Sequence, residues 1–571
     1  MRNALKLRSI VLRCKAGLGA IILLSIIINI MVLNGSIYMM MVYDRAIPSA
    51  NLTTLASLSV IATGIYVFQA LFEVMRGKLL SDLAASLDEA IVLPAALASQ
   101  KLALTKPELA RQESPLQDLE QVRSFLAGPG PAVLIDLPWV LFFLAILSMI
   151  HIWLGAAALA GAIVMILLTM RAESVARRSV GPLAELGQQR QHLIERQRQH
   201  AEVLAALGMG SRFARILALA SRRYSENQRR FSEKTNVLAT ASKSTRMFIQ
   251  SAILAVGTVL VLSGDASGGA IFASSILSGR ALAPVDQVIA QWRAFARTRL
   301  AWRRLDADLQ AISTLVEPTP IPLPLGQVEL QAVAVTPPGA DSPTLQEASF
   351  AVGPGSVIGV TGASGSGKSS LARALAGAWP SSAGEIRFDG ATREQWDADR
   401  LGSAIGYLPQ SVELISGTIA ENIARFDPAP APDAILEAAR LAGVHELIVN
   451  LANGYDTPVG DAGARLSGGQ RQRIGLARAL YGSPAIVVLD EPNSNLDPAG
   501  EAALANALAA LRARKATVFI VSHRQSILRE TTHLLRLNQG RISIFGPTAK
   551  VIEQLNARSG ENNFNKVAAN A

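Results

Sequence analysis

The 571-residue chain has little of what cross-links a protein or gathers a metal ion. It contains one cysteine, Cys14, and six histidines, which excludes an intramolecular disulfide and a multi-cysteine metal site and leaves little room for a histidine cluster. Charged residues make up only 17% of the chain, against about 25% in ordinary soluble proteins. Half of the residues are hydrophobic, and the mean hydropathy is +0.30. This composition excludes a disordered chain, a collagen-like fibre and a disulfide-rich secreted scaffold, and it predicts an integral membrane protein with an attached soluble part.

The charges that are present have a basic balance and an uneven distribution. The formal net charge is +10 and the isoelectric point is near 9.9, which on a soluble chain would favour a nucleic-acid partner. Residues 1–15 carry five basic residues and no acidic one, and twelve arginines lie between residues 171 and 230. Such clusters are typical of the cytoplasmic side of membrane proteins. We therefore expect no nucleic-acid partner, and a cytoplasmic N-terminal segment over 1–15.

The first apolar run, residues 16–42, is long enough to cross a bilayer core of ~30 Å at about 1.5 Å per residue. It exceeds the apolar core of about 7–15 residues in a signal peptide, so it predicts a retained first span. Further spans are expected at 52–75, 131–149, 152–170, 246–263 and 269–290. The last is the weakest, because Arg280 and Asp286 interrupt it.

The segments between these runs complete a membrane domain over 16–311. Residues 76–130 and 171–245 have helical periodicity, and we expect them to extend the spans into the cytoplasm. The short connections expected on the outside lie near 44–51, His151 and 263–267. The fold class predicted for this part is a transmembrane α-helical domain with six transmembrane helices.

The second part of the chain has the pattern of a soluble α/β domain. Four prolines at alternate positions forbid a helix near 312–326, which predicts a linker there. Over 327–555, short apolar runs alternate with helical segments. The expected strands include 357–360, 486–490 and 518–523. The polar tail, 556–571, is expected to be disordered.

A glycine- and serine-rich loop follows the strand expected at 357–360 and precedes a helical segment. It consists of Gly362, Ala363, Ser364, Gly365, Ser366, Gly367, Lys368 and Ser369, followed by Ser370. This strand–loop–helix context is that of a phosphate-binding loop, whose backbone N–H groups wrap the phosphates of a nucleotide. Lys368 is expected to hold the β- and γ-phosphates, and the Ser369 hydroxyl to ligate Mg²⁺.

Two carboxylates supply the remaining chemistry of phosphoryl transfer. Asp490 ends the strand expected at 486–490 and is placed to hold Mg²⁺ through water, and Glu491 is placed to polarise the attacking water. Phosphoryl transfer needs mostly positioning and charge neutralisation, so this set is nearly sufficient. This set lacks a cationic or dipolar group for the far side of the γ-phosphate. The segment LSGGQ at 466–470, which lies just before a helix, is a candidate for that group.

The order of these motifs resembles that of an ABC-transporter nucleotide-binding domain. The motifs are the phosphate loop, Gln410, LSGGQ, Asp490 with Glu491, Asp497 and His523. The resemblance implies a P-loop ABC fold and two ATP molecules held head to tail between two such domains, each by one chain's loop and the other chain's signature segment. The signature residues are Ser467, Gly468, Gly469 and Gln470. It further implies that Gln410 senses Mg²⁺ and the attacking water, that Asp497 couples the two sites and that His523 contacts the γ-phosphate. Since one chain carries one such domain, a homodimer with two active sites is expected.

The sequence around the motifs resembles that of the type I protein-secretion ABC transporters over roughly residues 15–550. Among them, it is most similar to the alkaline-protease/lipase exporter (PrtD-like) subgroup. The stretches concerned are 39–49, 125–140, 274–293, 335–339, 406–426 and 490–501. The resemblance implies a bacterial inner-membrane ATPase, surrounded by membrane lipid, that exports an unfolded RTX-type protease or lipase with a C-terminal signal. A periplasmic adaptor (membrane fusion) protein and a TolC-like outer-membrane channel would complete the path. Because the first span begins near residue 16, no N-terminal peptidase-like domain is expected, which disfavours the bacteriocin-processing and haemolysin-exporter subgroups.

Some features leave alternatives open. The chain is also compatible with an ABC exporter of lipid, drug or small peptide, or with a membrane scaffold that has a vestigial ATPase. Pro337 stands where many ABC domains have an aromatic residue that stacks on adenine, which puts stacking and strict base selectivity in doubt. Asp136 and Arg280 lie in apolar spans, where a charge usually faces a polar cavity or a partner, so both are candidates to line the cargo path. The alternative is that each lies near a helix end in the interfacial zone.

Overall fold

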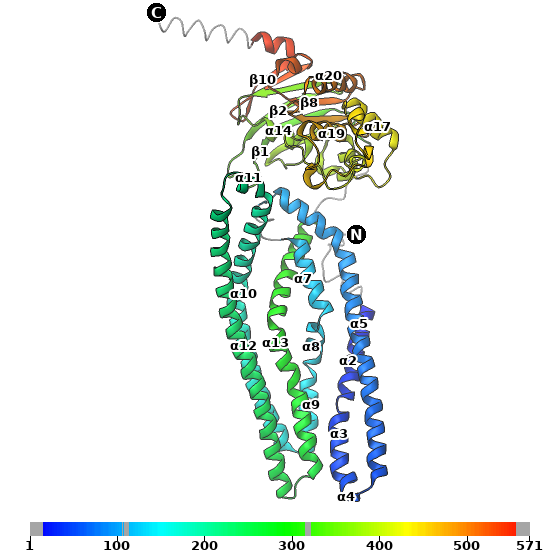
Figure 1. Cartoon of the computed structure of the whole chain (residues 1–571), viewed down its shortest axis with the longest axis vertical. Helices are drawn as coiled ribbons and strands as arrows, with labels where there is room; N and C mark the ends of the chain where they lie inside the picture. Colours follow the sequence, from blue (N-terminus) through cyan, green and yellow to red (C-terminus); the bar gives the residue numbers. More distant parts are fainter. Residues whose placement is uncertain (1–14, 106, 108–113, 314–320, 555–571) are drawn as a thin grey trace, which may run out of the picture. The chain divides into compact units, whose positions relative to one another are not determined.

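A computed structural model describes residues 15–105, 107, 114–313 and 321–554 (Figure 1). The chain divides into a helical unit, Met1–Ala103 with Glu108–Thr314, and an α/β unit, Leu104–Pro107 with Leu315–Ala571. The predicted tail 556–571, nearly all of the N-terminal segment 1–15 and residues 314–320 of the predicted linker lie outside the described residues.

The helical unit is built from long helices joined by short turns. Its elements are α2 (Lys15–Met31), α3 (Asn34–Met41), the π-helix η1 (Val42–Ala46), α4 (Ile47–Ser49), α5 (Leu52–Thr105), α7 (Pro115–Ala127), α8 (Gly130–Asp136), α9 (Trp139–Ile150), α10 (Ile152–Gln199), α11 (Ala201–Ala206), α12 (Gly210–Leu262) and α13 (Gly268–Ser313). Figure 1 shows α10, α12 and α13 running alongside one another, and these helices pack against each other. Their shared apolar core includes Leu154, Ile253 and Leu277, and α9 contributes Phe143 to it.

Within the described residues, five helical segments are long and apolar enough to cross a membrane. They are Gly17–Ser49, Leu52–Thr105, Gly130–Ile150, Ile152–Gln199 and Gly210–Leu262. The sixth predicted span, 269–290, lies in α13 but is not among them, because Arg280, Asp286 and several serines lower its hydropathy. The predicted turn at His151 is confirmed: the backbone of this residue is extended, and it separates α9 from α10.

The first span differs from the continuous helix that the sequence predicts. It breaks at Val32 and Leu33, between α2 and α3, where the apolar run gives way to Asn34, Gly35 and Ser36. The side chain of Asn34 donates to the carbonyl oxygen of Ala62 at 3.2 Å, so the polar break is stabilised by the neighbouring helix α5.

The segment 44–51, expected to be a connection, is mostly helical. The chain continues through η1 and α4 and turns only at Ala50 and Asn51. Asp44 of η1 accepts hydrogen bonds from the Ser267 hydroxyl and the Gly269 backbone N–H, both at 2.7 Å, at the start of α13. A Cβ atom at Gly269 would lie 2.6 Å from the Asp44 carboxyl carbon, so only glycine permits this approach. The contact therefore fastens the end of the first span to the beginning of the last helix.

Half-buried ion pairs connect different helices of this unit. Arg76 of α5 donates to both carboxylate oxygens of Asp136 on α8 at 3.0 Å, and Asn29 of α2 donates to the same carboxylate at 2.9 Å. Arg246 of α12 donates to Asp286 of α13 at 3.0 Å. Charges in an apolar bundle are costly unless paired, so these pairs also fix which helices lie together.

The α/β unit consists of two sheets with helices packed on them. Its strands are β1 (Val328–Val335), β2 (Leu345–Val352), β3 (Val357–Gly362), β4 (Ala383–Phe388), β5 (Ala391–Thr392), β6 (Ile405–Leu408), β7 (Ile486–Asp490), β8 (Thr517–Val521), β9 (His533–Asn538) and β10 (Arg541–Pro547). Its helices are α14 (Lys368–Ala376), α15 (Ala398–Ala404), α16 (Ile419–Ile423), α17 (Pro432–Leu441), α18 (His445–Val449), α19 (Gly468–Leu480), α20 (Pro498–Ala513) and α21 (Gln525–Arg529). The expected strands at 357–360, 486–490 and 518–523 are confirmed as β3, β7 and β8.

The larger sheet has the strand order β10-β9-β3-β8-β7-β6, and the smaller, antiparallel sheet the order β2-β1-β4-β5. Strands β6, β7, β8, β3 and β9 are parallel, and β7 and β8 are buried along their whole length. Parallel strands buried on both faces read as continuous apolar runs, which is why the sequence marks them clearly. Loops that follow the carboxyl ends of such strands meet at one edge of the sheet, where ligands bind in open α/β folds.

Candidate nucleotide-binding site

The loop between β3 and α14 has the geometry of a phosphate cradle. Gly367 adopts φ +97°, and a Cβ atom there would lie 2.6 Å from the carbonyl oxygen of Thr344, so no other residue fits without displacing backbone. The hydroxyls of Thr344 and Ser370 share a hydrogen bond of 2.6 Å, which holds the first turn of α14 against the start of β2. The N-terminus of α14 therefore faces the loop with its backbone N–H groups, as an anion site requires.

Lys368 is buried in this loop. Its ammonium group donates to the carbonyl oxygens of Gly362 and Ala363, at 3.0 and 2.8 Å. Burial lowers the pKa of Lys368, and the nearby carboxylates of Glu491 and Asp490 oppose that shift. The ammonium group is thus held among the residues that a triphosphate would contact.

Asp490 ends β7 beside the loop and has no exposed surface. The Ser369 hydroxyl donates to its Oδ1 at 3.4 Å, while Oδ2 is buried without a hydrogen-bond partner in the described part of the chain. Burial raises the pKa of Asp490, since the charged carboxylate loses its water. A hydroxyl and an under-satisfied carboxylate next to a phosphate cradle are the oxygen ligands that Mg²⁺ prefers, so the residues fit this ion.

The residue after Asp490 connects the other two predicted catalytic groups. Glu491 has φ +52°, an uncommon conformation for a non-glycine residue, which turns its side chain out of the strand direction. Gln410, in the loop after β6, donates to Glu491 at 3.0 Å, and the His523 ring nitrogen Nε2 lies 3.8 Å from its carboxylate. The structure thus brings together Gln410, Glu491 and His523 from three parallel strand ends.

The signature segment starts α19. Ser467 is the N-cap residue, and its hydroxyl accepts a hydrogen bond from the backbone N–H of Gln470 at 3.2 Å. The side-chain oxygen of Gln470 in turn accepts from the backbone N–H of Ser467 at 2.9 Å. This capping box fixes the helix start. Among the described residues no hydrogen bond joins 466–470 to the phosphate loop, so the chain does not complete its own site from this side.

Asp497 caps α20. It accepts from the Gly500 N–H at 2.9 Å and contacts the guanidinium of Arg473 on α19. The Gly500 hydrogen bond, followed by the one from Arg473, lowers the pKa of Asp497. This aspartate is therefore held as an anion between the two helices.

The other predicted residues lie elsewhere. Pro337 is half-buried in the β1–β2 connection. Asp136 is the partner of Arg76 and Asn29, whereas Arg280 is exposed on α13. Sequence reasoning missed Arg76, although it follows directly after the apolar part of the second predicted span, where a basic residue reads as an interfacial one.

Sequence reasoning also missed Arg425, a structural residue of the α/β unit. Its guanidinium donates to four backbone carbonyl oxygens, those of Arg478, Gly402, Ile405 and Ala479, at 2.9 to 3.1 Å. Burial, and secondly the charge of Arg478, lowers its pKa to about 10. No local pattern signals this role, because the carbonyls come from segments 20 to 54 residues away.

Comparisons with known proteins agree with this geometry. A family model described as ABC transporter matches residues 345–494. The fold is similar to that of a bacterial Atm1-family ABC exporter solved with ATP bound, with a TM-score of 0.80 at 22% identity, over 95% of this chain and 96% of that one. The nucleotide site and the apolar helices thus define a membrane-embedded ABC exporter, an ATPase coupled to transport.

The relatives narrow this class. The chain is 42% identical over 542 residues to the Type I secretion system ATP-binding protein PrsD of Rhizobium meliloti, with 95% of this chain and 93% of that protein covered. It is 27% identical over 537 residues to the cyclolysin secretion/processing ATP-binding protein CyaB of Bordetella pertussis, with 93% and 75% covered. The chain belongs to the ABC exporters of type I secretion systems.

Proposed function

We propose that the chain works as a homodimer in the bacterial inner membrane and uses ATP hydrolysis to export an unfolded protein cargo that carries a C-terminal signal. The relatives are named for the secretion of cyclolysin and for a type I secretion system, which supports a protein cargo. A periplasmic adaptor and an outer-membrane channel of the TolC type would carry the cargo onward, and the N-terminus and ATPase unit would be cytoplasmic.

The observation that carries the proposal is a site with catalytic groups on one side only. The phosphate loop, Asp490, Glu491, Gln410 and His523 lie together, while the Ser467 helix start has no hydrogen bond to the loop of its own chain in the described structure. A second copy, placed head to tail, would supply Ser467 and Gly469 to the far side of the γ-phosphate, where a helix N-terminus stabilises negative charge. Asp497 would then lie near the interface and couple the two sites.

In each site the chain's own groups would position the reaction. The loop N–H groups and Lys368 would bind the phosphates, and Ser369 and Asp490 would hold Mg²⁺, which supplies neutralisation of phosphate charge. Glu491, oriented by Gln410, would accept a hydrogen bond from the attacking water, and His523 would contact the γ-phosphate. Positioning and charge stabilisation supply most of the catalysis in phosphoryl transfer.

Asp136 and Arg280 remain our candidates for the cargo path. Arg280 is the stronger candidate of the two, because it is exposed in an apolar segment, whereas the charge of Asp136 is already balanced by Arg76. Arg280→Glu should reduce secretion and Arg280→Lys should retain most of it, with Asp136→Asn giving the smaller loss. Normal secretion by Arg280→Glu would remove this residue from the path.

The test is ATP hydrolysis by the full chain in lipid, with and without C-terminal segments of candidate secreted proteins. Glu491→Gln is the inactive control, and Glu446→Gln, an exposed substitution on α18, is the matched active control. A segment-specific change in rate, absent with scrambled segments, supports protein export. Hydrolysis that ignores every segment but responds to small amphiphiles would favour export of lipid, drug or peptide instead.

A further inference from the structure

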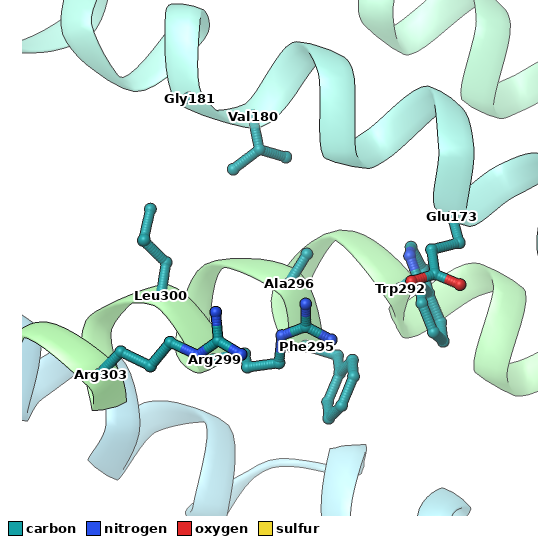
Figure 2. Close-up of a pocket in the computed structure, with 9 residues that line it drawn as sticks. All are labelled: Glu173, Val180, Gly181, Trp292, Phe295, Ala296, Arg299, Leu300 and Arg303. Atoms are coloured by element: carbon teal, nitrogen blue, oxygen red, sulfur yellow. The ribbon is translucent and has the colours of Figure 1, made fainter.

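Two sets of polar side chains lie apart from the catalytic groups described above. The first lines a pocket of about 270 Å³ between α10 and α13 in the helical unit. Figure 2 shows Glu173 beside Trp292, with Arg299 and Arg303 further along α13. Since both signs of charge line this space, its walls single out no ligand. The second set surrounds the loop that follows β7, residues 491–497 (the catalytic loop), and its hydrogen bonds lead to Gln472.

Gln472 lies near the start of α19, in the turn after the signature segment. Its side chain is 2% exposed, and its amide nitrogen donates to the carbonyl oxygen of Pro492 at 3.0 Å. Pro492 is buried as well and directly follows Glu491. The helix that begins with the signature segment is therefore bonded to the peptide group next to the proposed catalytic carboxylate.

Glu491 requires such support because of its backbone conformation. Its φ of +52° lies in the left-handed region, which a non-glycine residue keeps only where its surroundings hold it. Its N–H donates to the carbonyl oxygen of Val521 at 3.0 Å, and its carbonyl oxygen accepts from the N–H of Ser494 at 3.2 Å. The bond from Gln472 fixes the next carbonyl group, so the successive peptide groups of this turn are each held by a hydrogen bond.

The place of Gln472 is fixed in turn by its own segment. Arg471 donates to the carbonyl oxygens of Gly463 and Leu466, at 3.2 and 2.9 Å, and so holds the chain that leads into α19. An amide suits the position of Gln472, because it supplies a donor to a buried carbonyl without burying a charge. The donor therefore has a defined place, and its loss leaves the Pro492 carbonyl without this partner.

We propose that Gln472 is a positioning residue that orients Glu491 through the carbonyl group of Pro492. With the bond in place, the turn holds the Glu491 carboxylate toward the attacking water. Without it, the turn relaxes and the carboxylate leaves this orientation. The proposal rests on the role that the proposed function gives to Glu491, and it adds a residue that contacts neither nucleotide nor water.

Steady-state ATP hydrolysis by the full chain in lipid gives the first test. Gln472→Met keeps the length of the side chain but has no donor. We expect kcat to fall about tenfold and the KM for ATP to stay within about twofold, because the hydrogen bond reaches the catalytic loop. A purely structural bond would lower Tm and leave kcat unchanged.

Thr517→Val is the matched control. It removes a buried hydroxyl that donates to the carbonyl oxygen of Gly326, and Thr517 pairs with Ile486 at the start of β7, the end of the strand away from Glu491. Both variants lose a buried side-chain donor to a backbone carbonyl, so both should lower Tm by similar amounts. Only Gln472→Met should lower kcat.

Mixed dimers separate an effect on Glu491 from an effect on the signature helix. One chain carries Gly468→Asp, which places a negative charge against the partner's γ-phosphate. A Cβ atom at Gly468 has its nearest neighbour 4.0 Å away, and a carboxylate in the first turn of a helix is favourable, so α19 is not disturbed. The other chain carries Lys368→Ala. The site that stays intact in this dimer takes its Glu491 from the Gly468→Asp chain.

Gln472→Met on the Gly468→Asp chain should lower the rate of the mixed dimer about tenfold, and on the Lys368→Ala chain it should leave the rate unchanged. A fall only in the second arrangement would assign Gln472 to the signature side and overturn its role for Glu491. Unchanged kcat in the Gln472→Met homodimer, with Glu491→Gln inactive, would overturn the proposal and leave the proposed function intact.

Two other results concern the proposed function itself. Full hydrolysis by Glu491→Gln would contradict the role of Glu491, and that of Gln472 with it. An inactive mixed dimer without any change at Gln472 would contradict the head-to-tail arrangement, and the kcat of the Gln472→Met homodimer would then decide the role of Gln472. A fall in kcat that is confined to the Gly468→Asp chain supports the proposal.

Discussion

The ion pairs of the helical unit and the nucleotide site of the α/β unit treat their buried charges in opposite ways. In the helical unit, Asp136 and Asp286 are each paired with an arginine from another helix. At the nucleotide site, Asp490 has one carboxylate oxygen without a partner, and Lys368 donates only to carbonyls of its own loop. The paired charges of the helical unit specify which helices pack together, whereas the under-satisfied carboxylate of Asp490 fits a bound cation.

The largest effect is expected from the least satisfied charge. Asp490→Asn should reduce ATP hydrolysis on the order of a thousandfold, because an amide is a poor ligand for Mg²⁺ near the transferred phosphate. Since burial raises the pKa of Asp490, the ionised form destabilises the fold, and the amide should raise the Tm of the nucleotide-free protein. Calorimetry and a phosphate-release assay measure both, with exposed Asp399→Asn as control. A lower Tm of Asp490→Asn than of the unaltered protein would contradict the view that the charge of Asp490 is under-satisfied.

The paired charges should show the reverse behaviour. Arg76→Met leaves Asp136 without its ion pair and should destabilise the helical unit by about 3 kcal/mol. The double variant Arg76→Met/Asp136→Leu should recover much of that loss, because it leaves no unpaired charge. Thermal unfolding in detergent, with the single Asp136→Leu completing the cycle, measures the coupling. Additive effects of the two single variants would show that the pair contributes nothing.

Arg425 is a buried charge of the α/β unit whose partners are backbone carbonyl oxygens alone. It therefore provides a satisfied charge to compare with Asp490 in the same unit. Arg425→Lys keeps the charge but loses the planar fork that reaches four carbonyls, and it should cost about 2 kcal/mol of stability. The Mg²⁺ dependence of ATP hydrolysis should stay unchanged. Arg400→Lys, at an exposed position of α15, is the matched control in thermal unfolding. Equal stability of both variants would contradict the role given to the carbonyl contacts.

The smallest effect is expected at Asp497, which is satisfied but solvent-exposed. Its pKa is lowered below the ordinary 3.8, so its contribution to stability is present above that value and is lost as the pH falls through the lower pKa of the folded protein. Asp497→Asn keeps an N-cap side chain and should flatten the pH dependence of Tm below about pH 4. An unchanged acid limb of the Tm profile would show that the Arg473 contact is not maintained in solution.

The α/β unit could be predicted from the sequence more fully than the helical unit. The phosphate loop, Asp490 and Glu491 belong to contiguous motifs with a strand–loop–helix pattern, and buried parallel strands read as unbroken apolar runs. Asp136 stood out as a charge in an apolar segment, but its partners Arg76 and Asn29 lie 60 and 107 residues away, and no local pattern couples them. The break at Val32 was missed, because Asn34 is stabilised by a carbonyl on another helix rather than by anything in its own segment.

The break in the first span has a mechanical meaning. Its first piece, α2, is tied through Asn29 to Asp136 of α8 and so to Arg76 of α5, while its last piece, η1, is tied through Asp44 to the start of α13. The piece after the break is also held by α5, because Asn34 donates to the carbonyl oxygen of Ala62 and the Tyr38 hydroxyl shares a hydrogen bond with that of Ser59. A shift of α5 would therefore act on the first span on both sides of the break at Val32 and Leu33.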